Sequence, residues 1–255
     1  MNKRGQITLF IIIAVVIIAL AIFLLFFYPK MKIKKYEEPT NPHAYLQDCI
    51  NNALEPLVEK LASQGGYLEL GNCIFYKNIC RHYLCYTTQP YVPCINQEPL
   101  LKENIETILR ERLKQENVVS SCINRFIEYA RKKGYDVSSC EAPKFFVNLT
   151  KGRVNVPIEC KIVLKKGEEK KEFLEYNPYL TWPLFEFVLL SKQIIHEEIT
   201  NADFDPVAFM LRNYWIEIEK FRASEGSIIY TLRDRKTRKE FVFAVRNYVL
   251  PPGVL

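Results

Sequence analysis

Cysteine is the residue whose number and spacing give this chain its clearest chemistry. The sequence has 255 residues and eight cysteines, which are Cys49, Cys73, Cys80, Cys85, Cys94, Cys122, Cys140 and Cys160. An even number of cysteines behind an export signal is typical of disulfide bonds, because thiols are oxidised outside the cytoplasm. We therefore predict four disulfides. The sequence alone does not choose among the roughly 105 possible connectivities.

Metal binding and thiol redox chemistry are the alternatives for these cysteines. Cys80 and Cys85, with His82 between them, could supply zinc ligands. Cysteine pairs with two residues between them, which are usual in structural zinc sites, are absent. Redox-active sites need the same Cys-x-x-Cys spacing, so thiol redox chemistry is not predicted either. We therefore predict no metal site and no cofactor.

The histidines and glycines form no recognisable catalytic motif. His43, His82 and His196 are scattered along the chain. Residues 196–198 (His-Glu-Glu) begin like the His-Glu-x-x-His zinc motif, but Thr200 stands where the second histidine is needed. We interpret this stretch as a solvated helix face. The nine glycines provide neither a phosphate loop nor a dinucleotide fingerprint, so no catalytic or cofactor-binding residue is predicted.

Residues Asn148-Leu149-Thr150 form an N-glycosylation sequon. About one such triplet is expected by chance among this many asparagines, so the motif has little weight by itself.

Apolar periodicity predicts the elements that position the cysteines in the first half of the chain. A helix is expected from Pro42 to about Ser63, with Asn41 as its N-cap. Short aromatic runs at 67–70, 74–76 and 83–88 predict a small cross-linked sheet. Two further helices are expected, one at 101–117 and one beginning at a Ser121 cap and ending at Gly134.

From Lys144 onwards the apolar residues alternate with a period of two, which predicts strands at 153–164 and 171–176. A helix of about 18 residues is expected after Pro183 and a short helix after Asp205. Three strands follow at 215–222, 227–234 and 240–245. Because helices and antiparallel strands are grouped rather than alternating, the predicted fold class is α+β.

One disulfide follows from strand geometry. If residues 144–149 and 153–164 form a hairpin that turns at 150–152, Cys160 lies opposite Ala142 and within reach of Cys140. We predict a Cys140–Cys160 bond.

Residues 7–28 contain no charged residue and no proline. As a helix they would extend roughly 33 Å, enough to cross a bilayer core. Six of the 35 Lys and Arg residues lie within residues 1–35, which hold no acidic residue, and this leaves 29 basic against 29 acidic residues in the remainder. The excess charge belongs at a membrane boundary, and the neutral remainder argues against nucleic-acid binding.

Lys3-Arg4-Gly5-Gln6, directly before this aliphatic run, resembles the archaeal class III signal peptide of type IV prepilins. The resemblance implies cleavage between Gly5 and Gln6 and a mature protein that stays anchored or packs into a filament. Assembling pilins usually carry Glu at the fifth mature position, where this chain has Phe10, so filament assembly is left open. The alternative is an ordinary uncleaved anchor.

The helix around Asp48-Cys49, the break at residues 64–67 (Gln-Gly-Gly-Tyr) and the strand at 241–245 are similar to a loose group of archaeal membrane-anchored surface proteins. This resemblance implies a location and no activity. Lysines that follow the span favour a cytoplasmic C-terminal side, whereas the prepilin-like start and the cysteines favour an external one. We expect the external orientation.

The expected organisation is a stub and transmembrane helix at 1–28, a linker at 29–41, a helical cysteine-rich region at 42–140, and an antiparallel β region with helices at 141–255. We expect a single-pass, membrane-anchored, extracytoplasmic protein of the cell envelope with a pilin-like, structural or surface-interaction role. An exported, membrane-tethered hydrolase without a recognisable motif is the alternative. The expected partners are the membrane and proteins that bind the transmembrane helix or an apolar surface, and the oligomeric state is left open.

Overall fold

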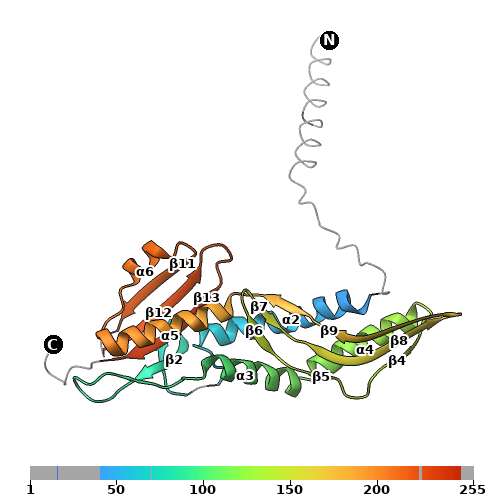
Figure 1. Cartoon of the computed structure of the whole chain (residues 1–255), viewed down its shortest axis with the longest axis horizontal. Helices are drawn as coiled ribbons and strands as arrows, with labels where there is room; N and C mark the ends of the chain where they lie inside the picture. Colours follow the sequence, from blue (N-terminus) through green and yellow to red (C-terminus); the bar gives the residue numbers. More distant parts are fainter. Residues whose placement is uncertain (1–15, 17–40, 70, 224–225, 248–255) are drawn as a thin grey trace, which may run out of the picture. The chain divides into compact units, whose positions relative to one another are not determined.

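A computed structural model describes residues 16, 41–69, 71–223 and 226–247 (Figure 1). The chain forms two compact units, residues 1–38 and 39–255. The predicted processing site at Gly5 and Gln6 lies outside the described residues, as does the predicted span at 7–28 except for Val16. Within the described ranges, none of the helices combines the length and apolarity needed to cross a membrane.

The helices of the second unit begin close to where the sequence predicts. They are α2 (Pro42–Ser63), α3 (Leu101–Gln115), α4 (Val118–Lys132), α5 (Leu184–Asn201) and α6 (Pro206–Arg212). The Asn41 side chain accepts a hydrogen bond of 3.0 Å from the His43 backbone N–H, and Asp205 caps α6 in the same way. The predicted Asn41 cap is therefore confirmed, as is the short helix expected after Asp205.

The prediction of Ser121 as the N-cap of α4 is wrong. The helix begins at Val118, and Asn117 is the residue that precedes it. Asn117 adopts a left-handed conformation with φ +50°, which connects α3 to α4 in a tight turn. Ser121 then donates its backbone N–H to the carbonyl of Asn117, so it lies within the first turn of the helix and does not cap it. Asparagine tolerates this backbone region better than most residues.

The largest sheet has the strand order β1-β2-β13-β12-β11, with β3 also paired to β2. Its strands are β1 (Cys73–Tyr76), β2 (Ile79–Tyr86), β3 (Ile95–Asn96), β11 (Ile216–Arg222), β12 (Ser227–Asp234) and β13 (Glu240–Arg246). The pair β2–β13 is parallel and the other pairs are antiparallel. Strands from the predicted 42–140 and 141–255 regions thus share one sheet. The small cross-linked sheet expected near 67–88 is therefore part of a larger sheet and does not stand alone.

The strand expected at 67–70 is not formed by the described residues 67–69. This segment instead wraps around His82. The Tyr67 ring stacks on the imidazole, and the carbonyl oxygen of Glu69 lies 2.8 Å from its Nε2 atom. The backbone carbonyl is therefore used by a side chain, which takes it away from any strand ladder.

Two smaller antiparallel sheets follow, with orders β10-β7-β6 and β4-β8-β5, and β9 pairs with the other edge of β8. Their strands are β4 (Asp136–Ser138), β5 (Lys144–Phe145), β6 (Asn148–Thr150), β7 (Arg153–Asn155), β8 (Ile158–Lys166), β9 (Glu169–Tyr176) and β10 (Tyr179–Thr181). The continuous strand predicted at 153–164 is divided into β7 and β8. Pro157 lies at the break, because proline has no N–H to donate to a ladder.

Helix α2 connects the three sheets. It contacts β13, β10 and β9, one strand from each sheet, and it also packs on α4 (Figure 1). The side chains of Leu46, Ile50, Leu54 and Val58 recur every fourth residue and have no exposed surface. This apolar stripe is the core face that the sequence predicts.

All eight cysteines form disulfides, and no cysteine is free among the described residues. The bonds are Cys49–Cys122, Cys73–Cys80, Cys85–Cys94 and Cys140–Cys160, with Cα–Cα distances of 5.8, 5.5, 5.4 and 5.4 Å. The predicted Cys140–Cys160 bond is present. Its hairpin register has Lys144 opposite Glu159, one residue from the predicted register.

We expect the disulfides to contribute unequally to stability. Cys49–Cys122 joins residues 73 apart, whereas Cys73–Cys80 joins residues only 7 apart. On the chain-entropy model, removing these bonds destabilises the fold by about 4 and about 2 kcal/mol respectively. Urea unfolding of the double variants C49S/C122S and C73S/C80S measures the difference. An equal or larger loss for C73S/C80S would contradict this expectation.

Candidate functional site

The three histidines lie in separate environments. His43 packs with its ring centroid 5.0 Å from that of Tyr176, and His196 is exposed on α5. His82 is buried on β2. Cys80 and Cys85, which flank His82, belong to two different disulfides. In the part of the chain that the structure describes, no group of three or more His, Cys, Asp or Glu side chains could hold a metal ion.

His82 is a packed core residue. Its ring centroid lies 4.2 Å from that of Tyr67, with the two planes inclined by 16°. Because Nε2 faces the carbonyl of Glu69, it is the nitrogen that carries the proton and donates. A Cβ atom at Gly71 would lie 2.9 Å from the imidazole Cε1, so this position needs glycine. Burial lowers the pKa of His82, although the hydrogen bond to Glu69 acts in the opposite direction.

The interpretation of residues 196–198 as a solvated face is wrong for Glu198. His196 is exposed, but Glu198 has no exposed surface. Residues i and i+2 of a helix are separated by about 200° around its axis, so the side chains of His196 and Glu198 point to opposite sides of α5. The sequence motif therefore does not bring its histidine and this glutamate together.

Glu198 is the centre of a buried polar cluster. Its Oε1 atom accepts from the Tyr230 hydroxyl, from Lys220 Nζ at 3.1 Å and from the Phe204 backbone N–H at 3.3 Å. Its Oε2 atom lies 3.3 Å from Asn247 Nδ2. Burial raises the pKa of the Tyr230 phenol, and the neighbouring charge of Glu198 raises this pKa further. These groups satisfy a carboxylate that would otherwise be costly to bury.

The cluster connects the interior to the surface. Lys220 also binds Asp203, which in turn pairs with Arg222 at 2.7 Å. Asp203 and Arg222 are both exposed, whereas the Lys220 side chain is 10% exposed. The cluster holds α5, β11 and β12 together. A carboxylate with no exposed surface is placed to stabilise this packing and not to meet a ligand.

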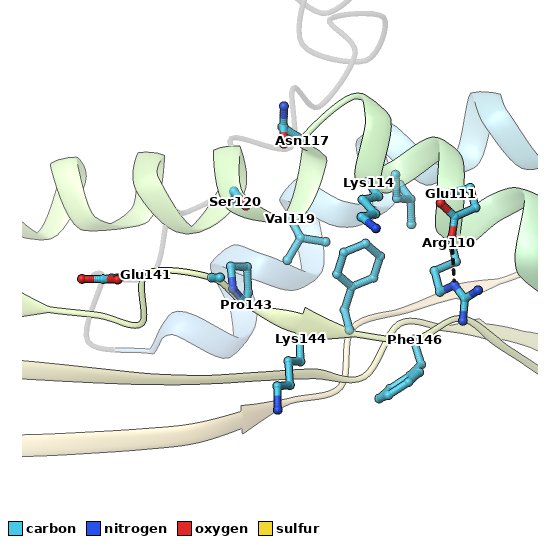
Figure 2. A pocket seen from close by; sticks show the side chains of 13 residues that line it. Arg110, Glu111, Lys114, Asn117, Val119, Ser120, Glu141, Pro143, Lys144 and Phe146 are labelled. Atoms are coloured by element: carbon cyan, nitrogen blue, oxygen red, sulfur yellow. Dashed lines mark ion pairs between the residues drawn. The ribbon is translucent and has the colours of Figure 1, made fainter.

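One surface cleft of the described residues is a candidate ligand site. It has a volume of about 530 Å³ and lies between α3, the start of α4 and residues 141–146. Figure 2 shows Arg110 and Lys114 on the α3 side, whereas the side chains of Lys144 and Phe146 extend from the strand side and point away from the helices. The Phe146 side chain is 53% exposed. The volume is within the range usual for pockets that bind small molecules or a few residues of a peptide.

The lining of the cleft is both apolar and charged. Arg110 and Glu111 form an ion pair of 3.4 Å, drawn as a dashed line in Figure 2. Lys114 and Lys144 also line the cleft, and neither forms an ion pair with another described residue. Pro143, Phe145 and Phe146 contribute apolar surface, whereas Val119 is only 1% exposed. This combination suits a ligand that presents an apolar group together with a negative charge.

The sequence does not predict this cleft, although it contains one signal of an exposed aromatic residue here. Phe145 and Phe146 are consecutive, and neighbouring side chains of a strand point to opposite faces. One of two adjacent aromatic residues in a half-buried strand is therefore exposed. The helical wall of the cleft, from α3 and α4, is brought to Phe146 only by the tertiary fold.

Comparisons with models of known protein families, with curated proteins and with solved structures found no match. The function is therefore argued from the geometry of this chain.

Replacing Glu198 by alanine is expected to destabilise the fold by about 3–5 kcal/mol, because Lys220, Tyr230 and Asn247 lose their shared acceptor. The double variant E198Q/K220M removes both charges and is expected to cost less than the sum of its single changes. Urea unfolding of the full double-mutant cycle measures both effects. The control is E197A, on the partly exposed neighbour, with a change within about 0.5 kcal/mol. If E198A behaves like E197A, the cluster has no stabilising role.

The stability of the domain is expected to fall as the pH decreases below about 6.5. In the unfolded chain His82 takes up a proton near that pH, but burial lowers its pKa in the folded chain, so the folded chain binds fewer protons and acid favours unfolding. The contribution is at most about 1.4 kcal/mol per pH unit and is absent above the unfolded pKa. Urea unfolding between pH 5 and 7.5 is expected to show a flatter profile for H82F than for the control H196Q. Identical profiles for the two variants would contradict this assignment.

Proposed function

We propose that this chain is a single-pass, membrane-anchored protein whose folded domain lies outside the cytoplasm and acts by binding another component of the cell envelope. The observation that carries the proposal is the pairing of all eight cysteines in four disulfides. Such bonds persist in oxidising compartments and are rare in the cytoplasm. Four of them in one domain support an extracytoplasmic location.

The anchoring part of the proposal rests on the sequence of the first unit. Residues 7–28 are apolar and long enough to span a bilayer, and the preceding Lys3-Arg4-Gly5-Gln6 resembles a prepilin processing site. Cleavage there would make Gln6 the first residue of the mature protein. The proposed role is a pilin-like, structural or surface-interaction one.

Binding is favoured over catalysis by the composition of the surface cleft. The Ser120 hydroxyl lines the cleft, but a serine nucleophile is usually activated by a histidine, and the lining contains no histidine. Glu111 is paired with Arg110. An exposed aromatic residue, Phe146, in a cleft that is also lined by Lys114 and Lys144 is instead the kind of surface that receives a partner.

A second exposed apolar surface supports the same role. Val207 and Leu211 lie one turn apart on α6 and are 60% and 65% exposed. Tyr214 follows the helix and is 75% exposed. Contiguous apolar side chains on the surface mark sites of protein association. This surface and the cleft are therefore the two candidate contact regions of the domain.

The location can be tested by labelling thiols in native material. We expect none of the eight cysteines to react with an alkylating reagent until the protein is denatured and reduced, and we expect the protein to remain in the membrane fraction until detergent is added. The control C140S/C160S is expected to show six thiols after reduction, because one of the four bonds is missing. Eight reactive thiols in denatured but unreduced wild-type protein would exclude the oxidising location.

A further inference from the structure

The sequon at residues 148–150 has a geometry in the folded chain that its sequence does not reveal. These residues form β6, with Asn148 and Thr150 exposed and Leu149 only 2% exposed. Residues i and i+2 of a strand project from the same face. The acceptor amide of Asn148 and the hydroxyl of Thr150 therefore face solvent together, while Leu149 anchors the strand in the core.

The fold does not use the side-chain amide of Asn148. No hydrogen bond of this side chain occurs among the described residues, whereas the backbone carbonyl of Asn148 accepts from Asn155 Nδ2 at 3.2 Å. The same Asn155 atom donates to Thr150 Oγ1 at 2.8 Å. The strand is thus held by backbone and neighbouring groups, and the Asn148 nitrogen is left available for a covalent bond.

The surroundings of β6 leave room for a bulky group. β6 turns into β7 at Lys151 and Gly152, and a Cβ atom added to Gly152 would meet no atom within 4 Å. β6 is also the edge strand of the sheet β10-β7-β6. On its α3 side, the Leu149 backbone N–H donates to Glu106 Oε1 at 2.7 Å, so the contacts that fix this strand are separate from the exposed Asn148 side chain.

We propose that Asn148 is an N-glycosylation site. The inference rests on the proposed extracytoplasmic location, because lipid-linked oligosaccharides are transferred outside the cytoplasm. In the reaction the side-chain nitrogen of Asn148 bonds to the anomeric carbon of an oligosaccharide that is carried on a lipid phosphate. The bond from that carbon to the phosphate oxygen breaks, the lipid phosphate leaves, and a base of the transferase accepts the amide proton.

A glycan at this position would lie on the solvent face of β6. The strand edge itself is covered from the α3 side, where the Leu149 backbone N–H is bonded to Glu106. A bulky, hydrated sugar on the solvent face increases the solubility of the domain. Modification of Asn148 is therefore compatible with the fold and with a domain exposed at the cell surface.

The sequence provides internal controls for this site. Asn72 and Asn78 are exposed, but neither is followed two residues later by Ser or Thr. Asn148 is the asparagine in the chain that begins an Asn-x-Ser/Thr triplet with x other than proline. Peptides that contain Asn72 or Asn78 are therefore expected to be unmodified in the same sample.

The test is mass spectrometry of the full chain isolated from the envelope of its own cells, with glycopeptide analysis around residue 148. We expect a mass increase carried by Asn148 that is lost in N148Q and T150A and retained in T150S, which keeps the hydroxyl. Urea unfolding is expected to show that N148Q and T150A are both folded, with T150A slightly less stable than T150S because it lacks the bond from Asn155; loss of the glycan is then not loss of the fold.

The oxidation state of the cysteines is measured in the same preparation. If the thiols are blocked and Asn148 is unmodified, the glycosylation site is wrong and the proposed location stands. If eight thiols are free and Asn148 is unmodified, both are wrong. A mass increase that persists in T150A would show that the modification does not depend on the sequon, and this too would overturn the inference.

Discussion

The fold depends on the burial of one apolar face of helix α2. Leu46, Ile50, Leu54 and Val58 lie on this face without exposed surface, and the helix contacts one strand of each of the three sheets. A small three-stranded sheet such as β10-β7-β6 cannot form a core alone, because isolated small sheets are marginally stable in water. The common helix supplies the apolar surface that each sheet lacks, so the sheets are joined through α2 more than through one another.

Two different devices stabilise the two halves of the domain. The disulfides all lie between Cys49 and Cys160. The last third of the chain contains no cysteine. There the antiparallel strands β11 and β12 are joined to α5 by the buried cluster around Glu198. The two halves meet where Asn247 accepts from the backbone N–H of Cys94 at 2.8 Å while its side-chain nitrogen faces Glu198.

The segment from Cys140 to Gly152 contains two of the features proposed to interact with other molecules, which are one wall of the cleft and the sequon. Its base is fixed by the Cys140–Cys160 bond, and its middle provides Lys144 and Phe146 to the cleft. Its end forms the exposed sequon strand β6. Surface segments can hold functional side chains accurately only when a rigid scaffold supports them. Here one disulfide and the pairing of β5 with β8 give that support to a stretch with little regular structure.

The sequence by itself determined the elements that depend on local patterns. The α+β class, the Asn41 cap, the helix after Asp205, the pairing of Cys140 with Cys160 and most strand positions follow from periodicity, turn residues and neighbouring geometry. Only the tertiary structure decided the features that join distant residues: the parallel β2–β13 pair, the burial of Glu198 and the cleft between α3 and Phe146. Local patterns do not contain this information, because a glutamate on a polar helix face looks the same whether water or Lys220 and Tyr230 will surround it. Its burial becomes favourable only when those partners arrive from other strands.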